Sequence, residues 1–261
     1  MRRSLWACPL LFIASPAAAQ DAQFCADRPG LGTPACTMPP GQVMIELGLA
    51  SWDHSADQSF VEDDLGFGQT LIRVGLGDRT EVELGFGGYG TVRSRDRQAG
   101  TISQHSGLGD TTVAIRRSLS GPGGPLALHV FATLPTASSS IGAGDWDAGA
   151  LLPFSLDLPA GFELDLTPEI DAAVNAGGKG RHLAWGGVTG LGHSLGRNLS
   201  VEAEIGVWQD NDPSGHVTDA RASVSLAWQA SKNWQLDLEG DAGLSAAAPR
   251  HSLLVGLARR F

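Results

Sequence analysis

The sequence predicts an all-β fold, a transmembrane antiparallel β-barrel of about 12 strands with short periplasmic turns and longer extracellular loops. Three observations predict this class. Apolar residues alternate with polar or small ones in successive runs, which is the period of a β-strand. The links between the runs are alternately short and long, as in outer-membrane barrels. The chain also begins with an export signal and ends on an aromatic residue, Phe261.

The N-terminal residues have the layout of a secretory signal. Arg2 and Arg3 precede an apolar stretch at 5–13, and small residues at 17–19 suit a cleavage site. We therefore expect residues 1–19 to be a signal peptide. The predicted location of the remaining chain is the outer membrane of a Gram-negative bacterium.

Residues 20–41 are rich in proline and glycine and show no strand pattern, so we expect them to form a periplasmic segment ahead of a barrel at 42–261. This segment contains Cys25 and Cys36. Because an exported chain meets oxidising conditions, the two cysteines are expected to form a disulfide. A metal-binding pair is the alternative, but no histidine lies nearby. We expect no metal and no cofactor.

Twelve runs carry the strand alternation, and an even number puts both termini on the periplasmic side. The predicted strands cover residues 42–52, 69–77, 80–90, 110–118, 126–134, 147–156, 161–173, 182–194, 199–209, 217–228, 234–244 and 250–261.

The links between these runs set the direction of the barrel. Short links follow every second strand, at 78–79, 120–124, 158–160, 196–198 and 231–233. Long links at 53–68, 91–109 and 135–146 follow the first, third and fifth strands, and the later ones are intermediate. A soluble β-sandwich gives no reason for this alternation, whereas an outer-membrane barrel places short turns in the periplasm and longer loops outside.

The run 234–244 shows the two faces most clearly. Leu236 and Leu238 share one parity, and Asp237 and Glu239 share the other. In a barrel the apolar parity faces lipid and the carboxylates face a wet lumen, whereas a soluble sandwich reverses this assignment. Parity alone does not separate the two folds. The turn asymmetry, the signal peptide and the terminal Phe261 favour the barrel.

The inner parity of the predicted strands supplies the candidate site, a set of lumen-lining residues in which carboxylates outnumber cations. These residues are Glu46, Arg73, Glu83, Arg116, His129, Glu163, Asp165, Glu169, Asp171, Glu202, Glu204, Asp237, Glu239 and Asp241. A ring of carboxylates selects cations, so one interpretation is a cation-preferring pore. The other is a structural lumen in which Arg73 and Arg116 pair with carboxylates.

Charge and residue order argue against two further classes of function, nucleic-acid binding and catalysis. The net charge of −10 argues against nucleic acid as a partner. A catalytic site is not expected: His193 and Ser194 are neighbours on one strand, so their side chains point to opposite faces and cannot act together. The acidic stretch with Asp53, Asp57, Glu62, Asp63 and Asp64 either binds divalent cations near lipopolysaccharide or is a solvated loop.

Several short motifs resemble a known family. They are the stretches CADRPGLGTPAC (25–36), GLGDT (107–111) and LPT (134–136), the glycine-rich loop at 142–145 and the closing LLVGLARRF (253–261). In this order they resemble the outer-membrane transporter family named for the MetA pathway of phenol degradation. The resemblance covers nearly the whole mature chain. It implies an outer-membrane barrel that passes small compounds, including aromatic ones, and it carries over no catalytic residue.

The leading functional hypothesis is therefore passive diffusion of small molecules across the outer membrane through an acidic lumen. A non-conducting structural or interaction barrel is the second hypothesis, and a soluble secreted β-sandwich is the third. The expected partners are outer-membrane lipid and lipopolysaccharide, a small-molecule solute, and the barrel-assembly machinery, which would recognise the strand ending in Phe261. No nucleic-acid partner is expected.

Overall fold

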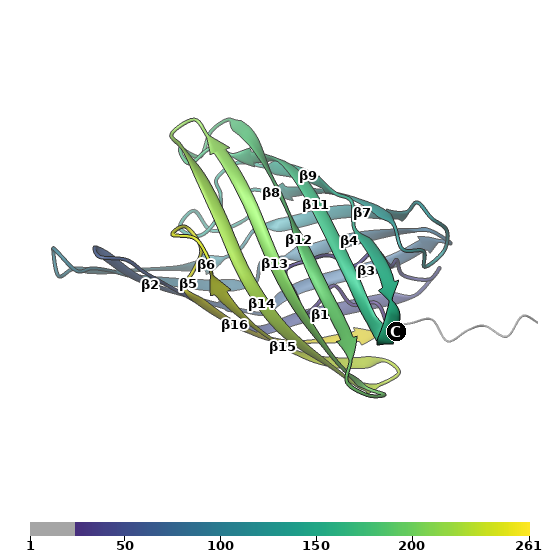
Figure 1. The fold of residues 1–261 in the computed structure, drawn as a ribbon. Helices are drawn as coiled ribbons and strands as arrows, with labels where there is room; N and C mark the ends of the chain where they lie inside the picture. Colours follow the sequence, from purple (N-terminus) through teal and green to yellow (C-terminus); the bar gives the residue numbers. More distant parts are fainter. Residues whose placement is uncertain (1–23) are drawn as a thin grey trace, which may run out of the picture.

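The computed structural model describes residues 24–261 and shows a closed antiparallel barrel (Figure 1). The predicted signal peptide lies outside the described residues. No helix among residues 24–261 is long and apolar enough to cross a membrane. The strands are β1 (Val43–Ala56), β2 (Phe60–Phe67), β3 (Gln69–Gly77), β4 (Thr80–Phe86), β5 (Tyr89–Asp96), β6 (Ile102–Leu108), β7 (Thr111–Ser118), β8 (Ala127–Leu134), β9 (Asp147–Leu151), β10 (Phe154–Leu158), β11 (Phe162–Val174), β12 (Arg181–Ser194), β13 (Leu199–Asp212), β14 (Gly215–Ser231), β15 (Trp234–Gly243) and β16 (His251–Arg260).

The wall has twelve positions, as the sequence predicts, because four pairs of strands lie in line with each other. These pairs are β2 with β3, β4 with β5, β6 with β7, and β9 with β10. The pairing of β16 with β1, from Met44 opposite Arg260 to His54 opposite His251, closes the barrel. All neighbouring strands are antiparallel, and this closure excludes the two-layer sandwich.

The structure differs from the sequence prediction in two of the three long links. The sequence predicts loops at 53–68 and 91–109, but β1 runs on to Ala56 and β2, β5 and β6 fill most of the rest. The prediction missed these strands because acidic residues obscure their alternation. The alternation is nevertheless present, since Leu65 and Phe67 are exposed and the Gly66 between them is half-buried. The third link, 135–146, contains no strand.

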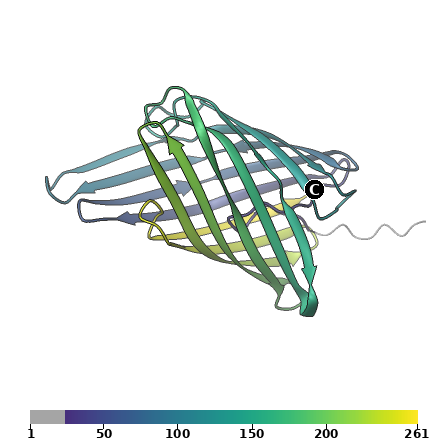
Figure 2. The same cartoon turned by 45° about the horizontal axis from the view of Figure 1, so that its top comes forward.

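Glycine allows the strand pairs to bend where one strand passes into the next. Gly68 separates β2 from β3 with a φ of +69°, and Gly88 separates β4 from β5 with a φ of +68°. A Cβ on Gly88 would lie 2.3 Å from the carbonyl oxygen of Phe67. Only glycine adopts this backbone without strain, so the wall can turn outward at this level. Figures 1 and 2 show β2, β5 and β6 diverging from the outer ends of β12–β14.

The distribution of side chains is that of a barrel in lipid. Large apolar residues such as Leu238 and Leu253 are exposed on the outer surface, whereas Arg73, Arg116 and Glu81 are completely buried inside. This arrangement inverts that of a soluble protein and matches a lipid-facing exterior around a polar lumen.

Phe261 ends the chain at the short-turn end. Its amide donates to the carbonyl oxygen of Val43 at 2.8 Å, and its ring is exposed below the guanidinium of Arg259. Both ends of the barrel chain therefore meet at one rim.

Candidate functional site

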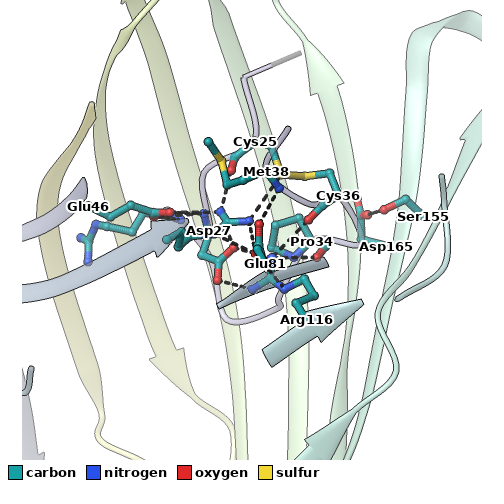
Figure 3. The surroundings of a disulfide bond; sticks show 12 residues. Cys25, Asp27, Pro34, Cys36, Met38, Glu46, Glu81, Arg116, Ser155 and Asp165 are labelled. Atoms are coloured by element: carbon teal, nitrogen blue, oxygen red, sulfur yellow. Dashed lines mark hydrogen bonds and ion pairs between the residues drawn. A yellow bond between two sulfur atoms is a disulfide. The ribbon is translucent and has the colours of Figure 1, made fainter. Parts of the chain in front are cut away.

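Residues 24–41, which we call the plug, lie inside the lumen. Over these residues the expectation of a periplasmic segment at 20–41 is wrong, because their backbone bonds to inward-facing residues of the wall, and residues 20–23 lie outside the described part of the chain. The plug approaches the wall closely at Gly75, where a Cβ would lie 2.0 Å from the carbonyl oxygen of Pro39. The predicted disulfide between Cys25 and Cys36 is confirmed, and it closes a loop within the plug (Figure 3). A proline- and glycine-rich chain shows no strand period, so no pattern in the sequence indicates this location.

Two buried arginines hold the plug against one side of the lumen. Arg73 on β3 and Arg116 on β7 both pair with Asp27 of the plug. The Nη1 atom of Arg116 lies 2.8 Å from Asp27 Oδ1, and its Nη2 atom lies 2.5 Å from Oδ2, so the contact is bidentate. Figure 3 shows Asp27 and Arg116 pointing toward one another. Paired guanidinium and carboxylate groups of this geometry give the strongest ionic hydrogen bonds.

The electrostatic balance at Asp27 favours its charged form. Burial by itself raises the pKa of this carboxyl group. The positive charges of Arg116 and Arg73, together with the hydrogen bond from Arg116, outweigh burial and hold the pKa below its ordinary range. Asp27 therefore remains a carboxylate that links the plug to the wall.

Carboxylates of the wall complete this side by binding the plug backbone. Glu46 on β1 accepts hydrogen bonds from the amides of Asp27 and Arg28 at 3.0 Å. Glu81 on β4 accepts the amide of Met38 at 2.5 Å and also pairs with Arg73 at 2.8 Å. Each buried charge here has an opposite charge or a backbone donor, as burial requires.

On the opposite side of the lumen, the wall carboxylates that contact the plug have no arginine of the wall within 4 Å, and Arg221 on β14 lines the outer cavity instead. Glu204 on β13 accepts the amides of Leu31 and Gly32 at 2.8 Å each. Glu239 on β15 accepts the amide of Gly30 at 2.9 Å. Asp237, also on β15, pairs with Arg28 of the plug at 3.1 Å. The plug therefore supplies the donors for these three carboxylates.

The plug leaves a cavity at each end of the lumen. One of about 400 Å³ lies at the short-turn end, where Glu163, Asp165 and Glu202 line it. A second, of about 480 Å³, lies on the outer side of the plug and is lined by Trp208 and Asp241 among others. The indole nitrogen of Trp208 donates to Glu169 at 3.1 Å. Each cavity is therefore bounded by carboxylates of the wall and by the plug, and Arg221 also lines the outer one.

The structure places every predicted lumen residue on the inner face of the wall. Six of them bond to the plug: Glu46, Arg73, Arg116, Glu204, Asp237 and Glu239. Glu83 and His129 lie beside Arg116, while Glu163, Asp165, Glu202 and Asp241 line the two cavities. Glu169 and Asp171 lie farther along β11, where Asp171 approaches Gly149.

Three charged residues that join the plug to the wall are absent from the predicted set, and so is Arg221 of the outer cavity. Glu81 shares the parity of Glu83, so the strand alternation could have identified it. Asp27 and Arg28 belong to the plug, and no pattern in the sequence indicates that they meet the wall.

Comparisons with known proteins agree with this architecture. A family model described as "Putative MetA-pathway of phenol degradation" matches residues 26–261. Among curated proteins no sequence matches this chain.

Solved structures with a similar fold include an outer membrane channel and the domains of two autotransporters. The COG4313 outer membrane channel from Pseudomonas putida F1 matches with a TM-score of 0.68 and 15% identity, over 90% of this chain and 99% of that one. The β-domain of the Bordetella autotransporter BrkA matches with a TM-score of 0.55 and 14% identity, over 85% and 100%. The translocator domain of the autotransporter NalP from Neisseria meningitidis matches with a TM-score of 0.52 and 18% identity, over 86% and 90%.

The closed barrel, the apolar exterior and the family match over nearly the whole described chain lead to one conclusion. This protein is an outer-membrane β-barrel and belongs to the MetA-pathway phenol-degradation family.

Proposed function

We propose that the protein lets small molecules diffuse across the outer membrane through its lumen, around or past the plug. The observation that carries this proposal is the pair of polar cavities, of about 400 and 480 Å³, that enter the lumen from opposite ends of the plug. A barrel of twelve strands is wide enough to leave such space beside a plug, between the filled eight-stranded barrels and the open porins.

The substrates we propose are small compounds that include aromatic ones, because the family is named for a pathway of phenol degradation. The charged residues of the lumen would select solutes by the charge that the solutes carry. With Glu163, Asp165 and Glu202 at one end and Asp241 at the other, cations would be admitted more readily than anions.

Single-channel recording in planar bilayers tests this function. The intact protein is expected to give a small conductance, and a variant lacking residues 24–40 a conductance several times larger, because the plug occupies the lumen. Different migration of boiled and unboiled samples on a gel verifies that each barrel is folded. If both folded proteins give neither conductance nor solute flux into liposomes, the proposal is wrong.

A non-conducting structural barrel is the second candidate, and the many buried bonds of the plug favour it. The same recordings separate the two functions. A folded intact protein that never conducts, beside a plug-deleted variant that does, would support the structural barrel.

We also propose that the barrel-assembly machinery recognises the C-terminal strand. Support comes from the exposed ring of Phe261 at the short-turn rim, where the first and last strands of the barrel meet.

A further inference from the structure

Four strand segments extend the wall beyond the bend glycines, and we call them the outer sheet. They are residues 51–56 of β1 together with β2, β5 and β6. The register defines rows of residues that lie side by side across these strands. One row contains Trp52, Leu65, Thr91 and Ser106, and the next row outward contains His54, Asp63, Arg93 and Gln104.

The pairing with β16 shows which face of the outer sheet continues the lipid-facing surface. Trp52 lies opposite Leu253, which is exposed, whereas Asp53 lies opposite Ser252, which is buried in the lumen. Since residues opposite each other in a sheet share a face, the rows of Trp52 and His54 face outward. Phe67 and Tyr89 are exposed on the same face, and they form the row next to that of Trp52 on its membrane side.

The length of β1 places these rows relative to the membrane. Val43 marks the inner rim, because it bonds to Phe261. A strand rises about 3.3 Å per residue and tilts by about 40°, so a hydrocarbon belt about 25 Å thick takes roughly ten residues. Val43 to Trp52 fills that length. The row of His54 and Arg93, and the row of Arg95 beyond it, therefore lie at the level of the lipid head groups.

Charge is segregated between the two faces of the outer sheet. The outward face carries the exposed Arg93 and Arg95, and its only carboxylate in these rows is Asp63. Asp63 already accepts hydrogen bonds from the Trp52 indole at 3.1 Å and shares one of 2.8 Å with His54.

The opposite face carries Asp53, Glu62 and Asp64, and Asp57 lies in the link between β1 and β2. The acidic stretch seen in the sequence is thus divided between two faces, and the described residues contain no group of three ligands that could hold a metal ion. This division argues against the divalent-cation interpretation of that stretch.

We propose that Arg93 and Arg95 bind the phosphate groups of the outer-leaflet glycolipid, lipopolysaccharide. Among the described residues neither guanidinium has an ion pair within 4 Å. A guanidinium matches a phosphate with two parallel hydrogen bonds, and the aromatic residues one and two rows below would contact the acyl chains. The site fits a lipid-linked phosphate because its arginines directly follow the lipid-facing surface.

The proposal is tested by measuring how tightly the folded, detergent-purified protein binds lipopolysaccharide. The measurement compares the native glycolipid with the same glycolipid after enzymatic dephosphorylation. An R93A/R95A variant should bind the phosphorylated lipid at least tenfold more weakly, and both proteins should bind the dephosphorylated lipid equally. The matched control is R79A/R117A, which removes two exposed arginines at the short-turn end and should bind like the native protein.

Three results would overturn it. Equal affinity of R93A/R95A and native protein for the phosphorylated lipid would show that these arginines do not contact it. An equal loss with the dephosphorylated lipid would show that they bind another group. Displacement of the lipid by millimolar inorganic phosphate alone would show a site for free phosphate.

Discussion

The two sides of the lumen neutralise their buried charges in different ways. The side built by β3, β4 and β7 pairs Arg73 and Arg116 with carboxylates of both wall and plug. On the side built by β11, β13 and β15, the wall carboxylates that contact the plug have no arginine of the wall within 4 Å, and the plug supplies their donors. The first side therefore combines arginines of the wall with carboxylates of both wall and plug, whereas the second depends on the plug for its partners.

This difference assigns separate roles to charges that look alike in the sequence. Removing an arginine from the first side leaves several buried carboxylates with a single arginine among them, which is costly in a low-dielectric environment. Neutralising a carboxylate of the second side removes charge beside a cavity. We therefore expect changes on the first side to affect stability and changes on the second to affect ion selection.

The largest expected effect comes from Arg116→Ala. Loss of this guanidinium leaves Asp27 with Arg73 alone and leaves Glu83 without a paired arginine, and we expect a loss of about 3–5 kcal/mol in the free energy of unfolding. Urea unfolding in lipid vesicles, followed by gel migration, measures it. Arg117→Ala removes the neighbouring exposed arginine and should change stability by less than about 0.5 kcal/mol. Similar losses in both variants would contradict the ionic network.

An intermediate effect is expected on the second side, from the double variant Glu239→Gln, Asp241→Asn. Both side chains line the outer cavity, so the variant should show lower cation preference with little change in stability. The reversal potential across a salt gradient measures this preference. Glu62→Gln, on the outer sheet, is the matched control. An unchanged reversal potential in the double variant would show that these carboxylates do not select ions.

The smallest expected effect comes from Gly256→Ala on β16. A Cβ there would lie 2.4 Å from Nε of Arg28, so the side chain of Arg28 should move away from Asp237 and loosen the plug. Faster hydrogen exchange at the plug amides would report this change. Gly240→Ala is the control, because its Cβ would meet only ordinary contacts, the nearest at 3.7 Å. Equal exchange in both variants would mean that Arg28 does not hold the plug.

Much of the barrel could be predicted from the sequence, because a wall residue faces either lipid or lumen and its alternation records which. That rule suffices for Glu239 and Arg116, whose parity alone assigns them to the inner face. It fails at 53–67, where Asp63 and Glu62 on the outer sheet look like a polar loop. It also fails for Asp27 and Arg28, since the plug has no period and its place depends on hydrogen bonds to residues far along the chain.

The plug lies across the seam at which the barrel closes. The amide of Arg28 bonds to Glu46 on the first strand, while its guanidinium passes Gly256 of the last strand and reaches Asp237, 209 positions away in sequence. These partners come together only when β16 has paired with β1. Docking of the plug is therefore a late event in biogenesis. Once the barrel has closed, the docked plug links its first strand to its last strands.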